Sequence, residues 1–461
     1  MMKTGFSKWF SSTMTDYGMI VALFILCAYF SWKTVETQYP AGKTAADQVC
    51  SKVMKKLGAD AKLIIVSGKG NADIEFSSAL ENDLLSNGVT PVDIVQGQPA
   101  DLRRAIEKAS ASGTVVNAIA CTNSVGAWQF IENLDRSFPS IGKIEVFIPE
   151  TYRWPDFLKP DNMLNIANQI VVIAIIAIGM TMVIITGGID LSVGSLIALS
   201  AVTATYSICR FGGAENATAS SMILSSILGI GVCALIGFCS GLLVAKLNIP
   251  SFIVTLSTML VGSGIAYIVA RGQSIYQVPE SFIWLGRGTV FGCVPVSVIL
   301  MIILYFAAHV MMSRTVLGRY IYAVGGNKES ARLSGVSVDK VIIFVYSICA
   351  ALAGLGGIIT ASQLKSGSPN YGQMYELYVI AAVVVGGTSL LGGAGKIFGT
   401  LIGAFIMAVI QNGMNLTGVE SYTQKVILGL VILGAVMLDM MKKSGKFTGI
   451  IKTVFNFTVF H

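Results

Sequence analysis

Two glycine-broken stretches carry polar side chains inside otherwise apolar sequence. The first, at 186–195, reads TGGIDLSVGS and contains Gly187, Gly188, Asp190 and Ser192. An ionised Asp at the centre of a bilayer costs at least roughly 2.5–3.5 kcal/mol on insertion scales, so Asp190 must face protein, water or an interface. Three roles are open for Asp190: it caps the helix that follows, it contacts a solute directly, or it belongs to a hinge or a salt bridge. We favour the cap, because an Asp ahead of a helix accepts its free N–H groups.

The second stretch, at 386–396, reads GGTSLLGGAGK and includes Gly386, Gly387 and Thr388. Lys396 does not belong to a phosphate-binding loop, because the first glycine of that motif would fall on Leu390. Dense glycines let helices approach closely, and a pair of broken helices is typical of a solute path through a membrane. Tight helix packing is the alternative interpretation.

Three amides follow in an apolar segment, at Gln411, Asn412 and Asn415. Gln411 and Asn415 lie four residues apart and therefore share a helix face. Amides on one face inside a membrane suit either an interhelical hydrogen bond or a polyhydroxyl ligand. The three residues are thus candidates for the same solute path as the glycine-broken stretches.

The segment 313–340 is polar and lies between two long apolar runs. Its cations outnumber its anions, which places the loop in the cytoplasm by the positive-inside rule. We interpret 325–327, Gly-Gly-Asn, as a turn, and we predict a short helix over 329–335 that Gly335 ends. Such a helix can seat in a cleft of another protein, although an ordinary solvated loop would have the same charges.

Catalytic and metal chemistry is not indicated. The chain has two histidines and eight cysteines without a CxxC pair, so a His/Cys metal site is not expected. It has neither GxxxxGK[ST] nor GxGxxG, so no nucleotide cofactor is expected in this chain. Cys50 and Cys121 fall in one polar segment, and the sequence leaves open whether they pair.

The elements that position these residues are membrane helices. The 461 residues are 54% hydrophobic and 12% charged, which indicates an α-helical polytopic membrane protein. Apolar runs predict about ten spans, some short enough to be re-entrant. The runs are 17–32, 166–186, 192–209, 220–245, 251–270, 294–312, 341–361, 377–391, 397–410 and 426–438. The first has no Ala-x-Ala site after it, so we expect an uncleaved helix rather than a signal peptide.

Residues 33–156 differ in character, because predicted strands and helices alternate there. That rhythm predicts an inserted α/β domain with a mainly parallel sheet. Its layout resembles one lobe of a periplasmic sugar-binding protein, and a docking or spacer domain without a ligand is the alternative. Placing the N-terminus inside puts most inter-helix Lys and Arg in the cytoplasm and the insert outside. The expected domains are 1–32, 33–156, 157–441 with the loop 313–340, and a cytoplasmic tail 442–461.

Several of these motifs carry a resemblance to a known family. The spacing of Glu329, Ala331 and Gly335, the segments 186–195 and 243–256, and the run from Gly318 to Gly335 resemble permeases of the ribose, xylose and galactoside branch of ATP-binding-cassette importers. The resemblance covers about 157–440 and, less clearly, 1–32. It implies a coupling loop whose residues are Gly326, Asn327, Glu329, Ala331 and Gly335.

The resemblance also implies what surrounds the chain. It implies a monosaccharide permease subunit in the bacterial inner membrane, without enzymatic activity of its own. The implied partners are a cytoplasmic subunit that binds ATP and Mg²⁺, an extracytoplasmic solute-binding protein, and a second permease subunit, identical or paralogous. A permease for branched-chain amino acids is the closest alternative.

Two other classes stay open. An ion-coupled secondary transporter would also use broken helices, and it would need intramembrane acids, for which Asp190 and Asp439 are the candidates. A membrane-anchored receptor would sense a ligand through the insert, although about ten helices are more than an anchor requires.

Overall fold

The computed structural model describes residues 2–134, 138, 144–290 and 292–443. The chain forms two compact units, one of Met1–Thr34 with Asp156–His461 and the other of Val35–Pro155. The predicted tail 442–461 falls almost wholly beyond Lys443 and, like the side chain of Asp439, lies outside the described residues. Each unit is considered by itself.

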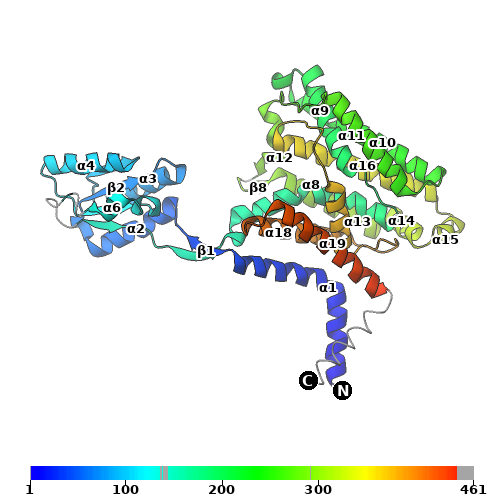
Figure 1. Ribbon diagram of the computed structural model, residues 1–461, viewed down its shortest axis with the longest axis horizontal. Helices are drawn as coiled ribbons and strands as arrows, with labels where there is room; N and C mark the ends of the chain where they lie inside the picture. The colour runs from blue at the N-terminus through cyan, green and yellow to red at the C-terminus, as the bar shows by residue number, and fades with distance from the viewer. Residues whose placement is uncertain (1, 135–137, 139–143, 291, 444–461) are drawn as a thin grey trace. The chain divides into compact units, whose positions relative to one another are not determined.

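The first unit is helical (Figure 1). Its main helices are α1 (Met2–Lys33), α8 (Pro160–Ile185), α9 (Val193–Phe211), α10 (Ala219–Lys246), α11 (Ser251–Ala270), α13 (Val296–Arg314), α14 (Val316–Gly326), α15 (Lys328–Leu333), α16 (Val338–Leu364), α17 (Tyr375–Val385), α18 (Ile397–Leu416) and α19 (Ser421–Lys443). The short helix α12 (Trp284–Arg287) and the paired strands β7 (Thr289–Val290) and β8 (Val294–Pro295) precede α13.

In the described part of the chain, seven helices are long and apolar enough to cross a membrane. They are α8, α9, α10, α11, α13, α16 and α18. Three further apolar helices are shorter, at Gly18–Lys33, Tyr375–Val385 and Ser421–Met437. The 11 residues of α17 extend roughly 16 Å at ~1.5 Å per residue, about half of a ~30 Å hydrocarbon core. The polytopic fold is therefore present, whereas the expected number of about ten spans stays a prediction.

Two helices form the centre of this unit. In α8, 89% of the most apolar window is buried, as expected for a helix that is hydrophobic on every side. The other, α16, contacts α8, α9 and α10, and glycines allow the close approach. A Cβ on Gly179 would lie 2.5 Å from the Cα of Cys349. By contrast, α10, α11 and α13 expose large apolar side chains such as Leu224, Leu260 and Phe306, which suit contact with lipid chains or another subunit.

The second unit contains a four-stranded sheet in the order β3-β2-β4-β5, all parallel. The strands are β2 (Leu63–Ser67), β3 (Asp93–Gln96), β4 (Ala118–Cys121) and β5 (Glu145–Phe147). Helices α2 (Gly42–Lys56) and α3 (Asn71–Ser86) pack on one face, and α4 (Pro99–Ala111), α5 (Asn123–Gly126) and α6 (Gln129–Glu132) pack on the other. The predicted alternation of strands and helices with a parallel sheet is confirmed.

Two features of the second unit differ from the prediction. The periodicity of 124–138 predicts one continuous helix, and this prediction is wrong, because Trp128 adopts an extended backbone between α5 and α6. The break lets Trp128 and Phe130 both pack against the core on that face of the sheet. The sequence also gave no sign of the antiparallel pair β1 (Val35–Gln38) and β6 (Tyr152–Pro155), which joins the two ends of the unit.

Cys50 and Cys121 do not form a disulfide. Both thiols are free, and they belong to hydrophobic clusters on opposite faces of the sheet. Burial raises the pKa of Cys121 to about 12. The two residues are therefore small apolar packers, separated by the sheet itself.

Candidate functional site

The predicted short helix of the polar loop is present as α15. Asn327 precedes it, and its side-chain oxygen accepts a hydrogen bond from the Ser330 N–H at 2.9 Å. Gly335 has φ +82°, a conformation that suits glycine at a helix end. The expectation of a turn at 325–327 is wrong for its first two residues, because Gly325 and Gly326 complete α14.

The outer surface of α15 combines charge with an exposed apolar side chain. Glu329 Oε1 lies 3.4 Å from Arg332 Nη1, and the two side chains are 76% and 58% exposed. Leu333 is 89% exposed, whereas Ala331 is buried against the rest of the unit. An ion pair this exposed contributes little to stability. The helix is thus anchored on its inner side and free for a partner on its outer side.

Gly325 brings α14 into backbone contact with two other segments. A Cβ on Gly325 would clash with the carbonyl oxygen of Ile185, the last residue of α8, and would lie 2.8 Å from Gly393 N. Gly393 N–H donates to that same Ile185 oxygen at 2.9 Å. A Cβ on Gly392 would lie 3.2 Å from Gly187 N. We call these five residues, Ile185, Gly187, Gly325, Gly392 and Gly393, the glycine junction.

The glycine junction joins the polar loop to both glycine-broken stretches. One stretch supplies Gly187, the other supplies Gly392 and Gly393, and α14 supplies Gly325. Tyr322, one turn earlier in α14, adds a hydrogen bond from its hydroxyl to the Gly395 carbonyl at 2.7 Å. Because these contacts are backbone against backbone, a shift of α14 must displace the end of α8 and the loop before α18.

Asp190 lies in the loop between α8 and α9 and is 1% exposed. Its Oδ1 accepts hydrogen bonds from Ser192 N at 2.9 Å and from Ser192 Oγ at 2.6 Å. The prediction that Asp190 avoids lipid is confirmed. The favoured helix cap is not observed, because Asp190 bonds Ser192, the residue before α9, rather than the N–H groups of the first turn. Gly188 lies beside Tyr346, because a Cβ there would clash with the tyrosine hydroxyl.

The first residues of the second stretch lie against other helices. A Cβ on Gly386 would lie 2.6 Å from the Gly399 carbonyl of α18, and Gly387, with φ +81°, lies near Met19 of α1. Thr388 is fully buried, and none of the described residues forms a hydrogen bond with its Oγ1. This stretch therefore packs on α18 at its start and enters the glycine junction at its end.

The amides of α18 are separate from the glycine junction. Asn412 and Asn162 exchange two hydrogen bonds, of 3.1 and 2.8 Å, between α18 and the first turn of α8. Asn415 Oδ1 accepts from Gln424 Nε2 at 2.8 Å, and Gln411 is partly buried. Asn412 lies thirteen residues along α18 from Gly399, roughly 20 Å at ~1.5 Å per residue. In this conformation, Asn412 serves an interhelical hydrogen bond.

Comparison with known proteins identifies the class of molecule. Residues 162–436 match the family described as the permease component of the branched-chain amino acid transport system. The chain belongs to this permease family. The ribose import permease of Escherichia coli K12 is 45% identical over 293 residues, which is 63% of this chain and 88% of that protein. The ribose import permease of Bacillus subtilis is 41% identical over 308 residues, 66% of this chain and 93% of that protein.

A third relative is the D-allose transport system permease of Escherichia coli, 36% identical over 286 residues, 62% of this chain and 85% of that protein. No solved structure matches the chain. Family membership makes the chain an ATP-binding-cassette importer permease of the inner membrane, a transporter subunit and not itself an enzyme. The family match begins after the second unit, which lies outside it.

The permease contains functional candidates that sequence patterns did not reveal. Tyr322 contributes a hydroxyl and Ile185 a backbone carbonyl, groups that every tyrosine and isoleucine has, so neither residue stands out in the sequence. Asn162 is the hydrogen-bond partner of Asn412 and lies 250 residues away from it in the sequence. The only available signal was the Gly325-Gly326 pair in a helix-like context, which indicates close backbone approach. Among the described residues, no group of three or more His, Cys, Asp and Glu side chains could hold a metal ion.

Proposed function

We propose that this permease carries a monosaccharide inward, as the membrane subunit of an importer driven by ATP. The observation that carries the proposal is 45% identity to a ribose import permease over 88% of its length. Relatives named for D-allose and L-arabinose transport support the same substrate class. Branched-chain amino acids are the second candidate, because the description of the matched family names them.

The proposed assembly follows from the family. ATP-binding-cassette importers require ATPase and solute-binding partners in general. We propose a cytoplasmic ATPase subunit that binds ATP and Mg²⁺, an extracytoplasmic solute-binding protein, and a second permease subunit, so that this chain needs no cofactor. Gly326, Asn327, Glu329, Ala331 and Gly335 form the coupling part of the loop. The four exposed residues contact the ATPase, and the buried Ala331 anchors α15 to the rest of the unit.

The proposed mechanism uses the glycine junction to transmit motion. Movement of the ATPase displaces α15 through its exposed face, which includes Glu329 and Leu333. The displacement passes through Asn327 to Gly325 at the adjoining end of α14, and from there to Ile185 and Gly393. Because α8 is buried on every side, its movement repacks the centre of the unit and reorients the candidate path around Gly187, Gly188, Asp190, Ser192, Gly386, Gly387 and Thr388.

The test reverses one exposed charge. Glu329→Lys should abolish sugar uptake and recovery of the ATPase with the tagged permease, while membrane insertion and thermal stability stay normal. Stability is preserved because the Glu329–Arg332 pair is exposed and contributes at most ~1 kcal/mol. Glu420→Lys makes the same charge change at an exposed residue outside the polar loop and should leave uptake unchanged. Uptake is measured with radiolabelled ribose in cells that lack other ribose importers.

Normal uptake by Glu329→Lys would remove the coupling role of α15. Recovery of the wild-type permease without any ATPase, under detergent conditions that preserve other importers, would reject the ATP-driven assembly and favour the ion-coupled alternative.

A further inference from the structure

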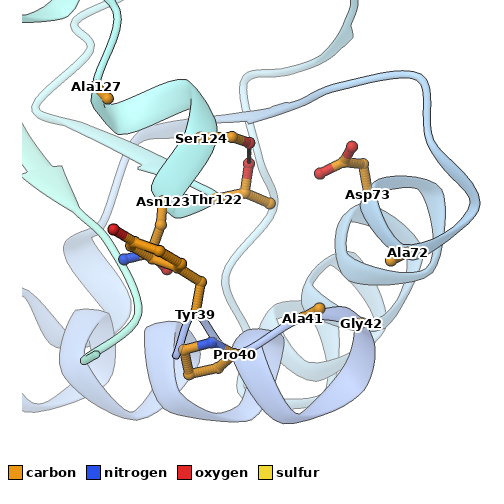
Figure 2. A pocket seen from close by; sticks show the side chains of 10 residues that line it. All are labelled: Tyr39, Pro40, Ala41, Gly42, Ala72, Asp73, Thr122, Asn123, Ser124 and Ala127. Atoms are coloured by element: carbon orange, nitrogen blue, oxygen red, sulfur yellow. Dashed lines mark hydrogen bonds between the residues drawn. The ribbon is translucent and has the colours of Figure 1, made fainter. Parts of the chain in front are cut away.

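The second unit contains a cavity that the permease mechanism does not use. The cavity has a volume of about 360 Å³, within the range of small-molecule sites. Figure 2 shows the residues that line it. Ten residues line it, all from the second unit: Tyr39, Pro40, Ala41, Gly42, Ala72, Asp73, Thr122, Asn123, Ser124 and Ala127.

The cavity lies where open parallel sheets bind their ligands. The strand order β3-β2-β4-β5 means that the chain leaves β2 toward one edge of the sheet and leaves β4 toward the other. Ligands of such sheets bind beyond the carboxyl ends of the strands at this change of direction. Ala72 and Asp73 come from the segment after β2, and Thr122, Asn123 and Ser124 follow β4 directly.

The polar groups of the cavity are mainly hydrogen-bond acceptors, so a ligand that fits them must supply donors. Asn123 Nδ2 donates to the Pro149 carbonyl at 3.0 Å, but its Oδ1 is buried and accepts no hydrogen bond from the described residues. Because Asn123 Oδ1 is shielded from solvent, a ligand in the cavity can donate to it only when the Asn123 side chain rotates toward the space. Asp73, whose carboxylate points into the space in Figure 2, is a pure acceptor when ionised.

The charge of the cavity restricts the ligand further. Its ten lining residues include one carboxylate and no Lys, Arg or His, so a phosphate or carboxylate ligand would meet the negative charge of Asp73 with no cationic side chain beside it. The hydroxyls of Thr122 and Ser124 bond each other at 3.1 Å and can exchange that bond for a ligand hydroxyl. Tyr39 is 64% exposed, and its ring beside Asn123 offers an apolar face to C–H groups.

We infer that this cavity binds a small neutral polyhydroxyl molecule, the ligand class to which monosaccharides belong. Its hydroxyls donate to Asp73, and to Asn123 Oδ1 once that side chain has rotated, and its ring packs on Tyr39. The site lies outside the residues that match the permease family, and it shares no residue with the glycine junction or with the candidate solute path.

The test uses the full-length permease in lipid nanodiscs and follows amide hydrogen exchange during titration with D-ribose, D-allose or L-arabinose. Concentrations extend to about 10 mM, which covers even millimolar affinity. At least one sugar should slow exchange at 68–75 and 122–127. Asp73→Asn should weaken that sugar's binding roughly 10-fold or more, because it replaces a charge-assisted hydrogen bond. Ala72→Phe should block binding by filling the cavity mouth without altering a polar group.

Asp60→Asn is the matched control, because Asp60 is an exposed carboxylate of the same unit outside the cavity, and it should leave binding unchanged. Glu329→Lys should also retain binding, so loss of uptake and loss of this site are distinguishable. Three results would overturn the inference: no protection by any of the sugars, protection only by ribose 5-phosphate or leucine, or protection that survives both Asp73→Asn and Ala72→Phe.

Discussion

Asp190 places a carboxylate in a buried loop, and its hydrogen bonds explain how the permease tolerates it. The Ser192 N–H and hydroxyl both donate to the same oxygen of Asp190. Ser251 Oγ accepts from Ile189 N–H at 3.2 Å, and Thr255 Oγ1 donates to the Ile189 carbonyl at 3.2 Å, which fix the loop to α11. These contacts depend on an oxygen acceptor rather than on negative charge.

Asp190→Asn therefore tests whether transport needs the negative charge of Asp190 or only its side-chain oxygen as a hydrogen-bond acceptor. Asn supplies the same side-chain oxygen to a turn of this type, so uptake should stay within about twofold of wild type. Asp190→Ala removes the acceptor, leaves the Ser192 donors unpaired and should lower stability by about 1–3 kcal/mol. Radiolabelled ribose uptake and thermal melting of the purified permease give the two measurements. Abolished uptake in a stable Asp190→Asn protein would mean that the charge itself is needed, as in an ion-coupled carrier.

Gly325→Ala tests the glycine junction at its tightest point. The added methyl group would meet the Ile185 carbonyl, so the backbone must shift, and overpacking of this kind costs about 1–3 kcal/mol. We expect a lower melting temperature and reduced uptake. Gly326→Ala is the comparison for stability, because a Cβ there has no described atom within 4 Å and alanine favours the helix. Equal melting temperatures for the two variants would contradict the close approach.

At the scale of elements, α18 has two ends with different roles. Its first turn packs against Gly386 through the Gly399 carbonyl, and its last turn holds Asn412 against Asn162 of α8. The helix thereby connects the glycine-broken stretch at one end to the start of α8 at the other. A third bond, between Thr181 of α8 and Thr400 of α18, holds the same two helices together at 2.7 Å.

A double-mutant cycle on Asn162 and Asn412 separates structure from transport. Interhelical hydrogen bonds in membranes contribute about 0.6 kcal/mol on average and up to ~1.7, so Asn162→Ala and Asn412→Ala should show a coupling energy in that range. The KM for ribose uptake should stay unchanged in the folded variants. A large rise in KM without coupling between the two sites would place Asn412 in the solute path instead.

Sequence patterns predicted the secondary-structure elements more successfully than they predicted the contacts between those elements. The apolar runs, the short helix α15 and the parallel sheet follow from local periodicity and turn residues, which each segment carries by itself. The glycine junction combines residues from three segments that are distant in the sequence. A contact between backbone atoms requires no particular side chain, so its only sign in the sequence is a glycine. The strands β1 and β6 escaped prediction because their sequences, VETQ and YRWP, are only four residues long, too short for a periodic pattern, and become strands only by pairing with each other.

At the scale of the whole molecule, the orientation in the membrane is testable through one cysteine. Cys293 is exposed in the segment between α12 and α13, which the charge distribution places outside. A variant that retains only Cys293 should react with a membrane-impermeant maleimide in intact spheroplasts.

A variant that retains only Cys121 is the control for accessibility. Its thiol is buried, and the same burial raises its pKa to about 12, so little of the reactive thiolate exists at neutral pH. It should stay unlabelled until the protein is denatured. Labelling of Cys293 only after the membrane is permeabilised would reverse the proposed orientation, including the external position of the second unit.

The strand pair β1–β6 has a consequence for how the chain folds. The Thr34 carbonyl accepts a hydrogen bond from Asp156 N–H at 2.9 Å, so the permease chain leaves and re-enters at almost one point. An unfolded connection as long as Val35–Pro155 would penalise the meeting of α1 and α8 by about 0.6 kcal/mol of closure entropy for each doubling of its length. Once the second unit has folded, that connection is as short as a turn. The folded insert thus holds the end of α1 and the start of α8 close together. The closure entropy for the membrane helices is therefore smallest when the insert folds first.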